Sequence, residues 1–263
     1  MTSKAWNTPR NGAFVDSVAI RAQLFEHNAL FRMTGFSSPV ISSSIDERPA
    51  RLMTDHVILL HGLWMRGFAL LMLHRRMMEA GFRVHRFDYM SVAAKQPRIL
   101  GSLQARVQEL GQDADTVHIV GHSLGGLLAL RACAEGSLPP GRVVCLGSPL
   151  KGSAAARRFA GMGRGGEVLL GHNRELLEYG FDRWDGEREV GVIAGKVPLG
   201  LGAMIGQFAG DNDGCVTVEE TILPGIADHC AIETNHTGLL FSQEAARQVT
   251  QFLQHGRFDH PGA

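Results

Sequence analysis

From about residue 55 onward the sequence alternates short apolar runs with segments of helical periodicity, and this alternation limits the fold more than any other feature. The apolar runs have the composition of buried strands. They span 56–61, 82–89, 116–120, 142–149, 188–195 and 229–234. Between them, the segment 97–110 places Ile99, Leu103, Val107 and Leu110 on one face of a helix. Such alternation predicts an α/β domain with a mostly parallel sheet of about six strands and helices on both faces.

Charge and composition exclude several kinds of partner. The chain has 26 Lys and Arg against 26 Asp and Glu, so it has no net positive field that would attract nucleic acid or an anionic membrane. Its apolar runs are too short to cross a bilayer, and its N-terminus lacks the apolar stretch of a secretory signal. We therefore expect a cytoplasmic protein with no nucleic-acid partner and no stable membrane insertion. The oligomeric state is left open.

The cysteines predict neither a metal site nor disulfides. Cys133, Cys145, Cys215 and Cys230 are widely separated and lack the paired spacing of a zinc site. Cys145 and Cys230 fall inside predicted strands, so buried free thiols are expected. The sequence predicts no metal ion and no cofactor.

Two segments stand apart from the regular pattern. Residues 1–50 form an N-terminal extension, in which the periodicity of 14–33 predicts an amphipathic helix followed by a Ser- and Pro-rich loop. Residues 51–263 form the main domain. Within it, 152–187 lacks strand character and predicts a loop with one or two short helices over one end of the sheet, where a lid would lie. A surface excursion without function is the alternative.

The hexapeptide GHSLGG at 121–126 directly follows a predicted strand and precedes a predicted helix. A turn sharp enough to push the Ser123 side chain clear of the sheet strains the backbone and brings strand and helix close together. That crowding explains Gly121 and Gly125, two residues before and two after the serine. The free N–H groups of the following helix would point at the hydroxyl. We interpret Ser123 as a nucleophile; a tight connection without chemistry is the structural alternative.

A serine nucleophile needs a general base, and His236 is the predicted one. Ligands of an open parallel sheet bind beyond the carboxyl ends of its strands. Of the histidines beyond residue 213, only His236 follows a predicted strand at that edge. His229 begins the last strand, His255 ends the last helix and His260 lies in the tail. His122, next to the serine, is expected to point elsewhere.

The group that orients the base is expected in the loop after the preceding strand, where GDNDGCV at 210–216 supplies two carboxylates. Asp213 is the predicted partner of His236, because the turn at Gly214 would aim its carboxylate back across the sheet edge. Asp211 is expected to cap the turn or to hold the loop through an Asx hydrogen bond. A polar surface turn is the structural alternative for both.

Acyl transfer also needs N–H donors for an oxyanion. The backbone N–H of Leu124, directly after the serine, is one predicted donor. The other should come from the loop after the strand at 56–61, where Gly62 lets the backbone turn and exposes the N–H of Leu63. Trp64 is the less favoured donor and is expected to line the substrate pocket, with a packed aromatic side chain as an equal alternative.

Together these motifs resemble those of the α/β-hydrolase superfamily, in particular bacterial lipases and esterases. The matching stretches are HGLW at 61–64, GHSLGG at 121–126, LGSPLKGS at 146–153, LLGHNRELLE at 169–178, GDNDGCV at 210–216 and NHTG at 235–238. The resemblance covers about residues 55–256 and implies an α/β-hydrolase fold with a short lid insertion. It also implies a serine hydrolase that cleaves small-molecule or lipid carboxylic esters through an acyl-enzyme on Ser123.

Two other functions fit the same residues. An acyltransferase would use the same triad and pass the acyl group to an alcohol. A catalytically silent binding protein would keep the fold, although such proteins usually lose a triad residue and this chain has all three.

Overall fold

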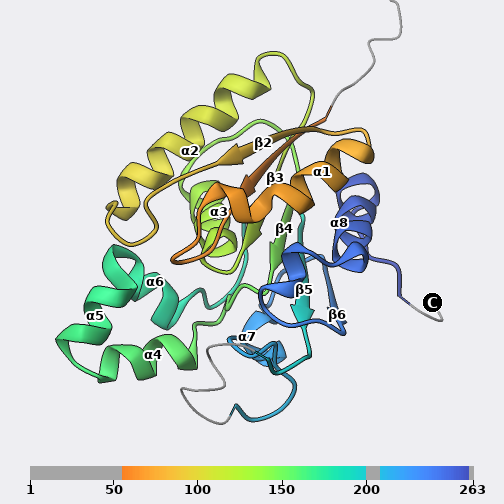
Figure 1. Cartoon of the computed structure of the whole chain (residues 1–263). Helices are drawn as coiled ribbons and strands as arrows, with labels where there is room; N and C mark the ends of the chain where they lie inside the picture. Colours follow the sequence, from red (N-terminus) through yellow and green to blue (C-terminus); the bar gives the residue numbers. More distant parts are fainter. Residues whose placement is uncertain (1–54, 200–207, 261–263) are drawn as a thin grey trace, which may run out of the picture. The chain divides into compact units, whose positions relative to one another are not determined.

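The computed structural model describes residues 55–199 and 208–260, and within them the predicted sheet is confirmed (Figure 1). Six parallel strands form one sheet in the order β2-β1-β3-β4-β5-β6. They are β1 (His56–Leu60), β2 (Arg83–Phe87), β3 (Val117–His122), β4 (Val143–Leu146), β5 (Val190–Gly195) and β6 (Asp228–Ile232). The helix expected at 14–33 lies outside the described residues.

Helices cover both faces of the sheet, as predicted (Figure 1). The longer ones are α1 (Leu71–Glu79), α2 (Gln96–Gly111), α3 (Leu124–Glu135) and α8 (Gln243–His255). Successive residues of β1 point to opposite faces. Ile58 and Leu60 pack with side chains of α2 and α3, whereas Val57 and Leu59 pack with side chains of α1 and α8.

The last helix begins and ends where local signals place it, with one correction. The Ser242 hydroxyl caps α8 by accepting the N–H of Ala245, and Gly256 ends the helix in the left-handed conformation with φ 73°. The helical spacing of Phe241, Ala245, Val249, Phe252 and Leu253 in the sequence also predicts that Phe241 lies on the buried face of this helix. That assignment was wrong, because the cap at Ser242 leaves Phe241 before the helix, with half of its surface exposed.

The segment between β4 and β5 has more helix than expected. It contains α4 (Ala154–Gly161), α5 (Arg164–Leu170) and α6 (Arg174–Tyr179), with a 3₁₀ turn before α6. Gly163 and Gly171 separate the three helices at positive φ, 77° and 62°, a conformation that glycine adopts without strain. Figure 1 shows all three helices beyond one end of the sheet.

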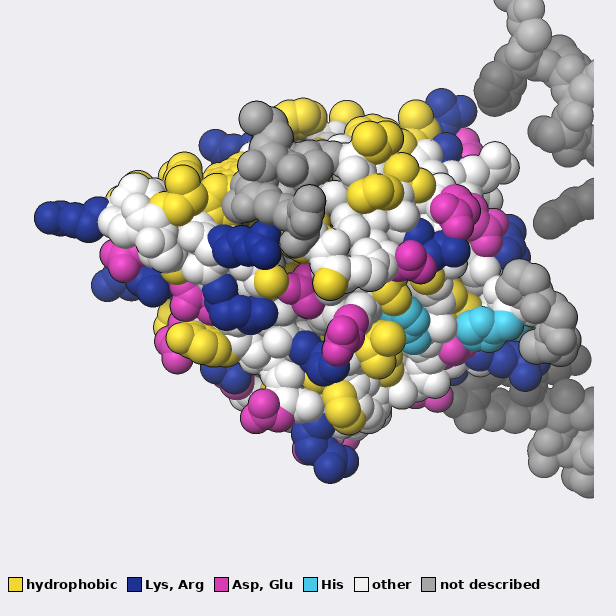
Figure 2. Space-filling view, turned by 90° about the horizontal axis from the view of Figure 1, so that it is seen from below, with side chains coloured by type: hydrophobic (Ala, Val, Ile, Leu, Met, Phe, Trp, Pro, Cys, Tyr) yellow, Lys and Arg dark blue, Asp and Glu magenta, His cyan; other side chains and the backbone are white. Residues whose placement is uncertain are grey.

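The outer surface of this region is mixed in character. Met162 and Val168 are each 71% exposed, and Figure 2 shows apolar side chains interspersed with Lys and Arg on the face seen from below. No helix in the described ranges has the length and hydropathy of a membrane span. A short α7 (Val218–Thr221) lies between β5 and β6.

Candidate active site

The strand order places the predicted site at a reversal of the chain's path across the sheet. After β1 the chain adds β2 on one side, and then returns to add β3 on the other side of β1. Ligands of open α/β sheets bind in the crevice outside the carboxyl ends of the strands at such a point. Gly62 follows β1 and Ser123 follows β3, so both lie at this crevice.

Ser123 has the strained backbone that the sequence predicted. Its φ of 54° and ψ of −120° lie outside the regions that non-glycine residues prefer. A Cβ on Gly121 would lie 2.4 Å from the backbone of Gly125, and a Cβ on Gly125 would lie 2.7 Å from the carbonyl oxygen of His61. Only glycines therefore allow strand and helix to approach closely enough to form this turn.

A cavity of about 350 Å³ opens at Ser123. His236, Leu63 and Trp64 line the same cavity, so the structure brings these predicted site residues together with the serine. Apolar side chains of the three short helices complete its wall; they are Ala155, Ala156, Phe159, Leu170 and Leu177. The cavity is therefore largely apolar, and its polar lining includes the Ser123 hydroxyl and the imidazoles of His122 and His236.

His236 and Asp213 form the predicted pair. The Nδ1–H of His236 donates to Oδ2 of Asp213 at 2.7 Å, and the backbone N–H of His236 donates to the carbonyl oxygen of Asp213 at 2.8 Å. The other carboxylate oxygen of Asp213 accepts the backbone N–H groups of Cys215 and Val216, at 2.9 and 2.7 Å. Asp213 is only 1% exposed, so this carboxylate is fixed by hydrogen bonds on both oxygens.

The bond to Asp213 also sets the tautomer of His236. With the proton on Nδ1, the Nε2 atom carries a free lone pair and can accept a proton. Within the described residues no hydrogen bond joins Ser123 to His236, although both side chains line the cavity. Catalytic hydrogen bonds are often long in the absence of substrate and tighten when it binds.

Asp211 is exposed and is not the Asx residue of this loop. The Oδ1 of Asn212 accepts the N–H of Gly214 at 3.1 Å, so Asn212 makes the Asx turn that the sequence assigned to Asp211. Asp211 contributes its carbonyl oxygen, which accepts the N–H of Val218.

The loop after β1 has two candidate backbone donors, the N–H groups of Leu63 and Trp64, and only the second is already hydrogen-bonded to another side chain. The carbonyl oxygen of Gly62 accepts the Nδ1–H of His61 at 2.9 Å. Because the two polar groups of a trans peptide point in opposite directions, the N–H of Leu63 faces away from that ring. The N–H of Trp64, by contrast, donates to the Ser91 hydroxyl at 3.1 Å. This geometry favours Leu63 over Trp64 as a donor.

Leu124 offers the second N–H. It is the first residue of α3, so the helix provides no carbonyl for its N–H. Ser123, in the same peptide unit, directs its carbonyl oxygen to the N–H of Gly126 at 3.1 Å. The N–H of Leu124 therefore points away from the body of the helix.

Trp64 lines the cavity and connects it to the three short helices. Its φ is 57°, and its indole N–H donates to the carbonyl oxygen of Leu169 at 2.9 Å. Its ring also meets Phe159 edge-on at 6.0 Å between centroids. Trp64 is 48% exposed, so it is a partly exposed wall of the cavity rather than a core residue.

Two further histidines, His61 and His122, make hydrogen bonds to residues that line the cavity. The prediction that His122 points elsewhere was wrong: its ring lies 4.6 Å from that of His236, and its Nε2–H donates to the carbonyl oxygen of His236 at 2.9 Å. Burial lowers the pKa of His122 to about 3, so the ring is neutral at ordinary pH.

His61, buried after β1, stacks on Tyr89 at 4.2 Å and lies 3.1 Å from Oδ1 of Asp88. Only the places of His61 and His122 beside Gly62 and Ser123 could have indicated them.

Two of the four cysteines are buried, as the sequence predicted, and two are not. Cys145 and Cys230 are buried, and burial raises the pKa of Cys230 to about 12. Cys133 and Cys215 are half-buried, and Cys215 lines the cavity. In the described ranges no three His, Cys, Asp or Glu side chains are arranged to hold a metal ion.

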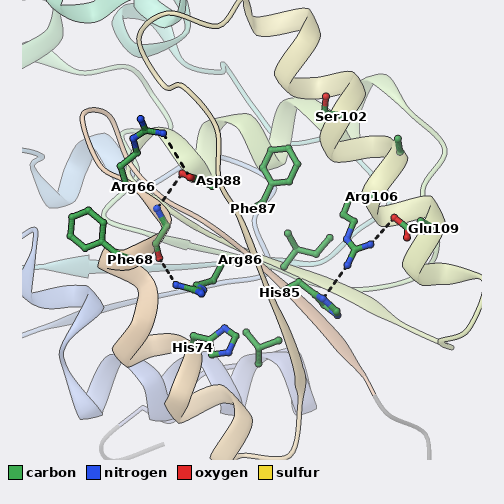
Figure 3. Close-up of a pocket in the computed structure, with 14 residues that line it drawn as sticks. Arg66, Phe68, His74, His85, Arg86, Phe87, Asp88, Ser102, Arg106 and Glu109 are labelled. Atoms are coloured by element: carbon green, nitrogen blue, oxygen red, sulfur yellow. Dashed lines mark hydrogen bonds and ion pairs between the residues drawn. The ribbon is translucent and has the colours of Figure 1, made fainter.

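A larger groove of about 1100 Å³ lies along β2 and contains none of the predicted site residues (Figure 3). Its charged side chains largely pair with one another. Arg106 donates to Glu109 at 2.6 Å, and Arg66 lies 3.8 Å from Asp88. Its size alone does not make it the site, because Ser123 and His236 line the smaller cavity.

Comparison with protein families matches residues 57–248 to the alpha/beta hydrolase family, and the chain therefore belongs to this family. Comparison with curated protein sequences gives no significant match.

Several solved structures share the fold. The lipase BlEst2 of Bacillus licheniformis in its propeptide form is 20% identical, with a TM-score of 0.62 over 72% of this chain and 48% of that one. Its mature form is 18% identical, with a TM-score of 0.58 over 77% of this chain and 92% of that one. A metagenomic carboxyl esterase is 19% identical, with a TM-score of 0.54 over 70% of this chain and 65% of that one. The chain thus spans about half of the propeptide form, and at these identities the likeness shows the fold alone.

Proposed function

We propose that this protein is a serine hydrolase that cleaves carboxylic esters through an acyl-enzyme on Ser123. The observation that carries the proposal is the meeting of a strained serine and an Asp213-bound histidine in one cavity. A buried carboxylate that orients an imidazole is the arrangement that activates a serine hydroxyl.

The reaction runs in two steps. His236 Nε2 takes the proton of Ser123 as the hydroxyl oxygen attacks the ester carbonyl, and the N–H groups of Leu63 and Leu124 stabilise the resulting oxyanion. The tetrahedral intermediate collapses as His236 returns the proton to the departing alcohol. Water, deprotonated by His236, then attacks the acyl-enzyme. The bond between the acyl carbon and the Ser123 oxygen breaks, His236 returns the proton to that oxygen, and the acid is released. Asp213 stabilises the imidazolium that forms in each step.

The cavity wall indicates the class of ester. Its apolar side chains favour an uncharged acyl chain. We infer that the segment 152–187 serves as the lid of this cavity, because Phe159, Leu170 and Leu177 from it form part of the wall. The mixed surface in Figure 2 favours dispersed ester molecules over a lipid aggregate as the substrate. The solved structures named lipase and carboxyl esterase support the same chemistry.

Labelling with a fluorophosphonate tests the proposal directly. The reagent should modify the wild-type protein once, at Ser123, and should not modify Ser123→Ala. A panel of nitrophenyl esters of increasing acyl length should be hydrolysed, with loss of activity after labelling. A folded wild-type protein that is neither labelled nor active on any ester would be a silent binding protein. Product partition in added alcohol separates hydrolysis from acyl transfer to an alcohol.

A further inference from the structure

His122 is a fully buried imidazole at the centre of the site that the reaction described above does not use. It is the last residue of β3, only 1% of its surface is exposed, and its ring lies against that of His236. It also lines the cavity that holds Ser123. Its hydrogen bonds therefore affect the proposed catalytic base directly.

One nitrogen of His122 is used and the other is not. Nε2 donates to the carbonyl oxygen of His236 at 2.9 Å, which places the single proton of the neutral ring on Nε2. Nδ1 is buried and has no hydrogen-bond partner in the described structure. It faces Gly62, where an added Cβ would lie 3.1 Å from it.

This imbalance shows what the imidazole contributes. A buried acceptor without a partner costs free energy, which a phenylalanine of similar shape would avoid. The favourable polar interaction that distinguishes histidine from phenylalanine here is the bond to the His236 carbonyl. That bond joins residues 114 positions apart in the chain.

The bond completes the fixation of His236. Asp213 holds the backbone N–H of His236 at 2.8 Å and its ring Nδ1 at 2.7 Å. His122 holds the remaining polar backbone group, the carbonyl oxygen, from the strand that ends directly before Ser123. The residue that carries the base is thus tied to the strand that carries the nucleophile.

We propose that His122 is a positioning residue, which sets the place of His236 relative to Ser123 by donating its Nε2–H to the His236 carbonyl. This inference rests on the proposed ester hydrolysis. It assigns His122 no contact with the reacting atoms. It predicts that the donor, rather than the ring, is what turnover requires.

Three variants separate the donor from the ring. His122→Phe keeps a ring and loses the donor, whereas His122→Gln places an amide N–H near the original Nε2. His122→Asn carries its amide closer to the position of Nδ1, too short to reach the carbonyl. His118→Phe is the matched control, since His118 is a buried histidine of the same strand, outside the cavity.

Steady-state kinetics on a nitrophenyl ester should then divide the variants. His122→Phe and His122→Asn should lose about 10- to 100-fold in kcat with KM within about twofold, the cost of a slightly misplaced catalytic group. His122→Gln should recover to within about threefold of wild type. His118→Phe should change the melting temperature and leave kcat within about twofold.

A second readout does not depend on turnover. The proton between His236 Nδ1 and Asp213 should give a low-field ¹H NMR resonance, which should shift or broaden in His122→Phe and return in His122→Gln. The positioning role would be overturned if His122→Phe had the same kcat as the wild-type protein. It would also be overturned if His122→Gln and His122→Asn lost kcat equally. If the wild-type protein hydrolyses no ester, the proposed function fails, and the resonance still decides the role: a signal unchanged in His122→Phe rejects it.

Discussion

Ser123 has its unusual backbone because it links the last residue of β3 to the first residue of α3 in a single step. Its hydroxyl is not a helix cap, since no side-chain cap bond is present at α3. Ser123→Ala should therefore fold normally and lose about four to six orders of magnitude in kcat on a nitrophenyl ester, as should His236→Ala.

The control for this loss is His255→Ala. His255 ends α8 on the surface and should affect the rate by no more than a few-fold. Circular dichroism of each variant confirms folding. A Ser123→Ala protein that retained most of its turnover would reject the acyl-enzyme, and an inactive His255→Ala would move the base to His255.

We predict that His61 affects the proposed reaction through a peptide bond. Its ring holds the carbonyl oxygen of Gly62, and so fixes the direction of the N–H of Leu63. His61→Phe keeps the stacking on Tyr89 but leaves the Gly62 carbonyl with only the longer hydrogen bond from the Met65 N–H, at 3.4 Å. We expect kcat to fall toward the roughly 100-fold loss that removal of one oxyanion donor causes, with KM little changed. A rise in KM at constant kcat, measured on the same ester, would instead indicate a role in ground-state binding.

At the scale of single residues, the sequence predicts the residues that belong to a motif. It misses the residues that hold those motif residues in place by hydrogen bonds. Ser123, Asp213 and His236 follow from chain order and from their places at strand ends. His61 and His122 could not be assigned, because the direction of an imidazole depends on partners elsewhere in the fold. The partner of His122 is 114 residues away.

At the scale of elements, α4 connects the cavity with the outer surface. Phe159 lies in α4 and lines the cavity, whereas Met162 directly follows the helix and is 71% exposed. Phe159→Ala should enlarge the cavity and move the preferred nitrophenyl ester to longer acyl chains, because each further buried methylene contributes about 0.8 kcal/mol. We expect the ratio of kcat/KM for dodecanoate to that for butyrate to rise by about tenfold. Met162→Ala is the control and should leave this ratio unchanged.

The elements differ in how well the sequence predicts them. The four central strands β1, β3, β4 and β5 were found because each is rich in apolar residues and both faces are covered, as in β3, where all six residues are buried. The number of helices at 154–179 was underestimated, because each helix has fewer than nine residues and glycines separate them. Short helices of this kind depend on packing, which periodicity alone does not show.

At the scale of the whole molecule, the alternating sequence pattern does not predict the order of the strands in the sheet. The pattern predicts parallel strands, but not that β1 lies between β2 and β3. That order makes the crevice in which Gly62 and Ser123 meet. The strand order is set by how the strands assemble in three dimensions. The distance between the proposed nucleophile and its proposed oxyanion donors is set in the same way.

Histidines buried throughout the domain give the whole molecule a stability that depends on pH. Burial lowers the pKa of His118 to about 4 and of His122 to about 3, against an ordinary value of 6.5. Burial is also the main cause of the lowered pKa of four others, His56, His74, His85 and His229. Below pH 6.5 the unfolded chain therefore binds more protons than the folded protein, and stability falls as the pH falls.

The melting temperature should accordingly drop by more than about 5 °C between pH 7 and pH 5, where several of these histidines act together. His118→Asn tests the cause. Asparagine removes the titrating ring and can still accept the backbone N–H of Arg142, which Nδ1 of His118 accepts at 2.9 Å. This variant should lose part of the decrease between pH 7 and pH 5. An unchanged decrease in His118→Asn would show that His118 contributes nothing to it, and a flat wild-type profile would show that the buried histidines do not govern acid stability.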